Sequence, residues 1–135
     1  MSRRVVAAAV LGVVVLAVAL LVVTRRDGNG DGLAEARRLL ADDGRFDTAY
    51  DAGDTFAVVG QLLQEDGESC RRDDATRPRC AHLLSASAAA QVMAYRVLDC
   101  TSPGRFDARA RLTEHLAALA AGQDPGDPPV PPDCD

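Results

Sequence analysis

The feature that most limits what this chain can fold into is an uninterrupted apolar run near the N-terminus, Val5 to Val23. It holds no charged or strongly polar side chain. A helix of that length spans ~28 Å, close to the hydrocarbon thickness of a bilayer. Arg3 and Arg4 flank the run on one side and Arg25 and Arg26 on the other, where their guanidinium groups can reach lipid headgroups. The run predicts a single-pass transmembrane helix at 5–23.

A cleaved signal peptide is the alternative reading of the same segment. Its apolar region should measure ~7–15 residues and end in a small-x-small site. The only such site near the end of this run is Ala17-Val18-Ala19, and cleavage there would leave an apolar new terminus at 20–23. The longer run favours an anchor that stays in place, a signal-anchor, over a cleaved signal.

The charges on either side of the run predict its orientation. Arg3, Arg4 and the terminal amine precede it, and Arg25 and Arg26 follow it, so the slight excess of positive charge lies on the N-terminal side. This bias predicts a cytoplasmic N-terminus at 1–4 and an extracytoplasmic C-terminal domain. Within the run, Ala8 and Gly12 form a small-xxx-small pair. Such a pair suits a homodimer contact but arises readily by chance in an Ala/Val-rich helix.

Charge and composition then describe the domain behind the anchor. All 20 acidic residues lie at or after Asp27 and face eleven arginines there, a net charge of −9. A domain this acidic repels phosphate backbones, so nucleic acid is not an expected partner. The chain has no Lys, Ile or Trp and is rich in Ala, Arg, Asp and Gly, a bias typical of a GC-rich bacterial genome. With few aromatic residues, the core must use Leu, Val and Ala, which suits closely packed helices.

Hydrophobic periodicity and turn residues predict an all-α fold, with three to four helices in a domain at 33–122. A Gly-rich hinge at 24–32 precedes it. The first helix has Asp31 as its cap and ends at Gly44, and the second runs from Asp54 or Thr55 to Glu65, where Gly67 stops it. A polar loop follows at 70–80, then a long buried central helix at 81–99, and then a last helix capped by Asp107 and stopped by Gly122. The Pro-rich tail at 123–135 should run extended over the surface.

The tetrapeptide Gly-Arg-Phe-Asp occurs twice, at 44–47 and at 104–107. The residues after the two copies do not match for long, so a duplication is disfavoured. The favoured interpretation is a recurring turn followed by a helix cap.

The cysteines, Cys70, Cys80, Cys100 and Cys134, form an even set in a small domain behind an anchor. This arrangement predicts disulfides and an oxidising compartment. Cys80 and Cys100 would lie ~30 Å apart at the two ends of the central helix, which excludes their pairing and, with it, Cys70–Cys134. Of the two remaining schemes, Cys70–Cys80 with Cys100–Cys134 is the simpler. Free thiols in a cytoplasmic domain are the alternative.

One segment resembles the start of an EF-hand calcium loop. Asp27, Asn29 and Asp31 occupy its first, third and fifth positions, and Gly32 its sixth. Glu35 falls at the ninth position. The twelfth, where a bidentate Glu belongs, is Arg38, so a flexible hinge with a helix cap is the favoured interpretation.

No other pattern predicts chemistry. His82 and His115 are the only histidines, and two histidines alone make a poor metal site. No catalytic motif or phosphate-binding loop is visible, so an enzyme is not expected, nor is a cofactor. The sequence favours a membrane-anchored extracytoplasmic helical module with an interaction or structural role. Its partners would be the lipid bilayer, through Val5–Val23, and a protein in the membrane or envelope. The alternative is an accessory calcium- or metal-binding protein.

Overall fold

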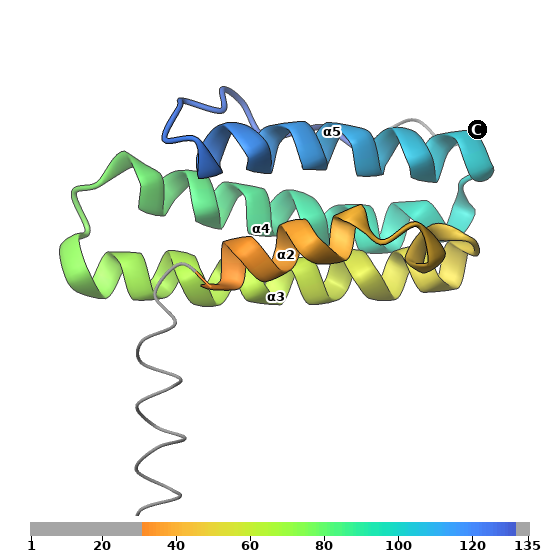
Figure 1. Cartoon of the computed structure of the whole chain (residues 1–135), viewed down its shortest axis with the longest axis horizontal. Coiled ribbons are helices and arrows are strands. Elements are labelled where there is room, and N and C mark those ends of the chain that lie inside the picture. Colours follow the sequence, from red (N-terminus) through yellow and green to blue (C-terminus); the bar gives the residue numbers. More distant parts are fainter. Residues whose placement is uncertain (1–30, 132–135) are drawn as a thin grey trace, which may run out of the picture.

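The computed structural model describes residues 31–131, which form an up-down-up-down bundle of four α-helices (Figure 1). They are α2 (Asp31–Ala41), α3 (Ala49–Asp74), α4 (Pro78–Arg96) and α5 (Ser102–Ala120), with short 3-10 helices η1 (Asp43–Phe46) and η2 (Val97–Asp99) between them. Each helix packs against the ones before and after it, and α5 closes the bundle against α2. The predicted all-α fold is confirmed, and no strand occurs within residues 31–131.

The predicted anchor at 5–23 lies outside the described residues. Among the helices of residues 31–131, none combines the length and the apolar character that a bilayer crossing requires.

The core is aliphatic, as the composition requires, with two exceptions. Phe46 of η1 and Phe56 of α3 are fully buried and meet edge to face, with ring centroids 5.6 Å apart. Around them the four helices contribute mostly Leu and Ala. The larger aliphatic members are Leu33, Leu39, Leu40, Val59, Leu63, Leu83, Met93, Val97, Leu112, Leu116 and Leu119.

Helix α3 is much longer than the sequence predicted. It begins after Thr48, whose Oγ1 accepts a hydrogen bond from the Asp51 amide (3.0 Å), and it continues through Gly67. The prediction that Gly67 stops this helix was wrong. A mid-helix glycine costs only about 1 kcal/mol. Here it is also needed, because a Cβ on Gly67 would lie 2.7 Å from Leu84 of α4.

Gly67 is one of three glycines that place α3 unusually close to α4. Gly53, Gly60 and Gly67 recur at every seventh position and face α4 along its length. A Cβ on Gly60 would lie 2.8 Å from Gln91 Cγ, and one on Gly53 would lie 3.1 Å from the Ala94 carbonyl oxygen. Ser87 Oγ crosses the contact and donates to the Gly60 carbonyl (2.6 Å). We call this contact the α3–α4 seam.

Two further expectations for α4 are corrected. The helix starts at Pro78, at its first turn, so the predicted polar loop at 70–80 shrinks to residues 75–77. Nor is α4 buried all the way round, because its outer face exposes Val92 (45%) and Tyr95 (78%). The sequence predicted a fully buried helix because alanines occur on more than one of its faces. In the bundle, the α4 side facing the core and the seam is covered, and the opposite side is open.

Helix α5 begins at Ser102, with Pro103 in its first turn, rather than after Asp107. Asp107 instead pairs with Arg111 one turn later (2.9 Å). The predicted stop at Gly122 is confirmed. That residue has a φ of 72°, and the amides of Gly122 and Gln123 bond back to the carbonyls of Leu119 and Ala118. Residues 123–131 contain no helix or strand, as predicted for that part of the tail.

Helix α2 is held at both ends by charged side chains from other helices. At its N-terminus the buried Asp66 carboxylate of α3 accepts a hydrogen bond from the Leu33 amide (2.8 Å). At its C-terminus Arg109 of α5 donates to the Leu40 carbonyl (2.6 Å). Both charges have the sign that the helix dipole favours. We call this pair of contacts the α2 clamp.

The start of α2 corrects the predicted C-terminal boundary of the hinge. Asp31 is the first residue of α2 rather than its cap, and Gly32 lies in the same turn, so neither belongs to a hinge at 24–32. A Cβ on Gly32 would lie 2.6 Å from both the Asp66 carboxylate and the Leu62 carbonyl oxygen. The glycine is therefore required by the close approach of α2 to α3.

The two Gly-Arg-Phe-Asp copies turn out to touch. Arg105, in the second copy, donates to the carbonyls of Phe46 (2.9 Å) and Asp47 (2.8 Å) in the first. The interpretation as a turn followed by a cap was wrong. The first copy lies in and just after η1, and the second lies within the first turns of α5.

Candidate functional site

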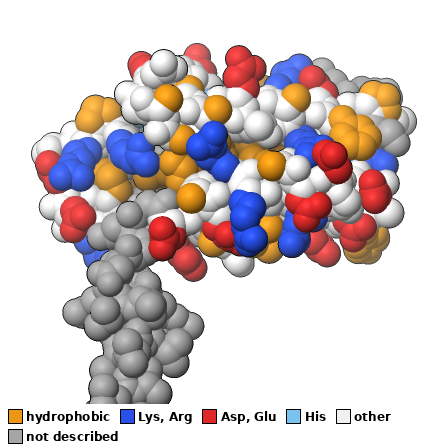
Figure 2. Space-filling view, in the orientation of Figure 1, with side chains coloured by type: hydrophobic (Ala, Val, Ile, Leu, Met, Phe, Trp, Pro, Cys, Tyr) orange, Lys and Arg blue, Asp and Glu red, His pale blue; other side chains and the backbone are white. Residues whose placement is uncertain are grey.

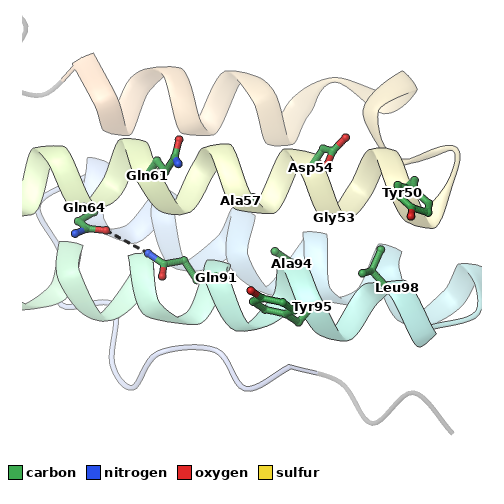
Figure 3. A pocket seen from close by; sticks show the side chains of 10 residues that line it. All are labelled: Tyr50, Gly53, Asp54, Ala57, Gln61, Gln64, Gln91, Ala94, Tyr95 and Leu98. Atoms are coloured by element: carbon green, nitrogen blue, oxygen red, sulfur yellow. Dashed lines mark hydrogen bonds between the residues drawn. The ribbon is translucent and has the colours of Figure 1, made fainter.

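The most distinctive surface feature is a groove on the outer side of the α3–α4 seam, with a volume of about 430 Å³. It forms because the seam residues there are small: Gly53 and Ala57 on α3 face Ala94 on α4. Figure 3 shows the side chains that line it. They are Tyr50, Gly53, Asp54, Ala57, Gln61, Gln64, Gln91, Ala94, Tyr95 and Leu98.

Both tyrosines of the chain lie at this groove. Tyr50 comes from the first turn of α3 and Tyr95 from the last turn of α4, and they are 77% and 78% exposed. Leu98 of η2 adds a half-exposed aliphatic side chain beside them (47%). Exposed aromatic rings of this kind offer apolar area together with a hydroxyl that can donate or accept, a combination typical of binding surfaces.

The other end of the groove is polar but nearly uncharged. Gln91 Nε2 donates to Gln64 Oε1 (3.4 Å, dashed in Figure 3) and to Ser87 Oγ (3.1 Å). Asp54 is the one carboxylate among the lining residues. On a domain with a net charge of −9, this face is therefore unusually neutral.

Sequence reasoning missed this groove. The signal was present in the seven-residue spacing of Gly53, Gly60 and Gly67, which indicates a second helix packed closely along one face of α3. It was hidden because Gly67 was interpreted as a helix stop. Because this helix was expected to run only from Asp54 or Thr55 to Glu65, Tyr50 could not be placed on the same surface as Tyr95.

The calcium-loop residues are only partly visible. Asp27 and Asn29 lie outside the described residues. Asp31 and Glu35 both lie on α2, where Glu35 accepts two hydrogen bonds from the Arg38 guanidinium. The Arg38 guanidinium also holds the pKa of Glu35 below its usual value. The basic residue that spoils the twelfth loop position thus engages the carboxylate at the ninth.

Histidines 82 and 115 are brought together by the antiparallel packing of α4 and α5. His115 is buried (7% exposed), and its Nε2 has no hydrogen-bond partner among the described residues. Burial lowers the pKa of His115, and the neighbouring His82 lowers it further. His82 Nε2 lies 3.7 Å from a carboxylate oxygen of Asp124 in the tail. No group of three or more His, Cys, Asp or Glu side chains within residues 31–131 could hold a metal ion.

Cys70 and Cys80 form a disulfide, with their Cα atoms 5.3 Å apart. This pairing was predicted, but its setting was not. The bond joins the last turns of α3 to the first turn of α4 and does not close a flexible loop. Cys100, 8% exposed, is also disulfide-bonded. Its predicted partner Cys134 lies outside the described residues, so that pairing stays a prediction.

Comparisons with known proteins add no family to this description. No protein family, curated protein or solved structure matches the chain.

Proposed function

We propose that this chain is a membrane-anchored helical module that binds another protein through the α3–α4 groove. The observation that carries the proposal is the pair of tyrosines, 77% and 78% exposed, on opposite sides of one groove. The chain has few aromatic residues, and its three Phe are used differently: Phe46 and Phe56 are buried in the core, and Phe106 is partly exposed. Tyr50 and Tyr95 contribute little to the core, so their surface area is available to a partner.

The lining of the groove favours a protein partner over a charged small molecule. Tyrosine, glutamine, alanine and leucine dominate it, and Asp54 supplies the single formal charge. A protein surface with an apolar centre and a polar rim matches such a lining. A phosphorylated ligand would need cations, and none lines the groove. The predicted anchor at 5–23 would hold the groove near the membrane, so the partner we propose is a protein of the same membrane or envelope.

Site-specific photo-crosslinking in native membranes tests this proposal. A photoreactive phenylalanine analogue at position 95 should give a discrete adduct whose partner mass spectrometry identifies. The same analogue at Val58, which is 44% exposed but does not line the groove, is the matched control. Adding Tyr50→Asp to the position-95 reporter should reduce the adduct at least tenfold. Equal adducts from positions 58 and 95, or no adduct at 95, would contradict the proposal.

A further inference from the structure

The end of the bundle opposite the groove tyrosines carries a cluster of arginines. Arg71 and Arg72 lie in the last turn of α3, Arg77 lies in the turn between the helices, and Arg79 lies in the first turn of α4. Between them stand only two acids, Asp73 and Asp74, so residues 71–79 carry a net charge of +2 on a domain whose net charge is −9. Figure 2 shows arginine side chains near this end of the molecule.

Two of the four arginines, Arg71 and Arg72, lack the contacts that Arg77 and Arg79 make within the fold. Arg79 donates to the Leu119 carbonyl at the end of α5 (2.9 Å), and Arg77 lies 3.8 Å from Asp74. Arg71 and Arg72 are exposed and pair with no acid among residues 31–131. Their guanidinium groups can meet an external anion without breaking an internal bond.

The chain enters the bundle close to this cluster. Helix α2 begins beside Asp66, which lies eight residues, about 12 Å of helix, before the end of α3. Tyr50 lies about 24 Å from Asp66 in the other direction along α3. Residues 24–30 separate the predicted anchor from α2. Even fully extended they reach no more than about 25 Å. The tether therefore joins the bundle nearer to its arginine end than to its tyrosine end.

We infer that Arg71 and Arg72 bind anionic phospholipid headgroups and so dock this end of the bundle onto the membrane. The inference rests on the proposed membrane anchor. Each arginine near an anionic membrane surface raises the affinity of the protein for that membrane about fivefold. The attraction fades within a Debye length of about 10 Å. Docking also fits the groove, because it leaves the surface around Tyr50 and Tyr95 turned away from the lipid and open to a partner.

The absence of tryptophan from the chain supplies a clean test. The full chain carrying Ala75→Trp, at the exposed α3–α4 turn, is reconstituted into vesicles that contain a dansyl-labelled lipid. Energy transfer to dansyl reports how close the turn lies to the headgroups. We expect at least threefold more transfer in vesicles with 30% phosphatidylglycerol than in pure phosphatidylcholine, and we expect loss of that gain in 0.5 M salt. Tyr50→Trp, at the far end, should show no such gain.

Two matched charge variants complete the test. Arg71→Ser with Arg72→Ser should weaken docking by about thirtyfold, the square of the effect of one arginine, and abolish the gain in transfer. Arg45→Ser with Arg96→Ser removes the same charge at the opposite end and should leave the gain unchanged. Circular dichroism would establish that both variants stay folded.

The outcomes separate this inference from the proposed anchor. Equal transfer in the two membranes, or equal loss in the two charge variants, would overturn lipid docking while the chain still floats with the vesicles. A gain abolished by millimolar inorganic phosphate would assign the arginines to a soluble anion and also overturn it. Failure of the full chain to float with either vesicle would overturn the anchor itself.

Discussion

The α3–α4 seam and the α2 clamp hold the same bundle together in opposite ways. In the seam, side chains are removed: Gly53, Gly60 and Gly67 let two backbones approach, and Ser87 makes the hydrogen bond across. In the clamp, long or charged side chains reach across to the ends of a short helix, Asp66 at one end and Arg109 at the other. The seam should therefore tolerate no added atom, whereas the clamp should be weakened by removing one.

The largest effect should come from filling the seam. Gly60→Val introduces a branched side chain where even a Cβ would lie 2.8 Å from Gln91 Cγ and 3.3 Å from the Ser87 carbonyl oxygen. Valine and glycine differ little in helix propensity, so overpacking decides the outcome. We expect the free energy of unfolding, measured in urea, to fall by about 3 kcal/mol. Glu65→Val, on an exposed position of the same helix away from the groove, is the control and should cost no more than about 0.5 kcal/mol. Similar losses in both would mean that the seam is loose.

Removing the Cys70–Cys80 disulfide tests whether the seam depends on the covalent link between the end of α3 and the start of α4. Replacing Cys70 and Cys80 with Ser opens a short loop whose closure is worth about 2.5 kcal/mol by loop entropy. We expect a drop of that size in the free energy of unfolding, with the helix content unchanged in circular dichroism. A loss below about 0.5 kcal/mol would contradict this expectation. It would mean that residues 70 and 80 already lie close together in the unfolded chain, so that the disulfide restricts that chain little.

The clamp should lose less. Arg109→Met removes the bond to the Leu40 carbonyl, the pair with Asp43 (2.8 Å) and the stacking over Phe46, whose ring centroid lies 4.6 Å from the guanidinium carbon. Methionine keeps much of the aliphatic stem, so the expected loss is about 2 kcal/mol, mainly from the unsatisfied carbonyl. Arg111→Met, on a half-exposed side chain paired with Asp107, is the control and should cost about 0.3 kcal/mol. Equal costs would reduce the clamp to an ordinary surface contact.

Seam and clamp also differ in how far the sequence could reveal them. The helical class, the Cys70–Cys80 bond and the stop at Gly122 follow from local patterns and were predicted. The seam left a local trace in its glycine spacing, which was misinterpreted because a glycine stop and a glycine contact look alike in one sequence. The clamp left none. Its contacts join residues 33 and 69 positions apart, and no periodicity connects Asp66 with Leu33 or Arg109 with Leu40.

The contact between α4 and α5 belongs to neither type, because it buries a titratable group that has no hydrogen-bond partner in the part of the chain that the structure describes. His115 is 7% exposed, its Nε2 makes no hydrogen bond within residues 31–131, and its pKa is lowered from 6.5 by burial and by nearby His82. Above pH ~6.5 the ring is neutral in both the folded and the unfolded chain, and it adds no pH dependence. Below that pH the unfolded chain takes up a proton that the folded chain does not, so stability falls as the pH falls.

His115→Leu should remove this dependence. Between pH 7 and pH 5 the free energy of unfolding of the parent should fall with a contribution from His115 of at most about 1.4 kcal/mol per pH unit, and the variant should lack that contribution. Urea unfolding at pH 7, 6 and 5 measures the difference, which isolates His115 because the carboxylates titrate alike in both proteins. His82→Asn should flatten the curve only slightly, since burial is the larger cause of the lowered pKa and His82 the smaller. Parallel curves for the parent and His115→Leu would mean that the folded protein accommodates the proton, with Nε2 reaching water or Asp124.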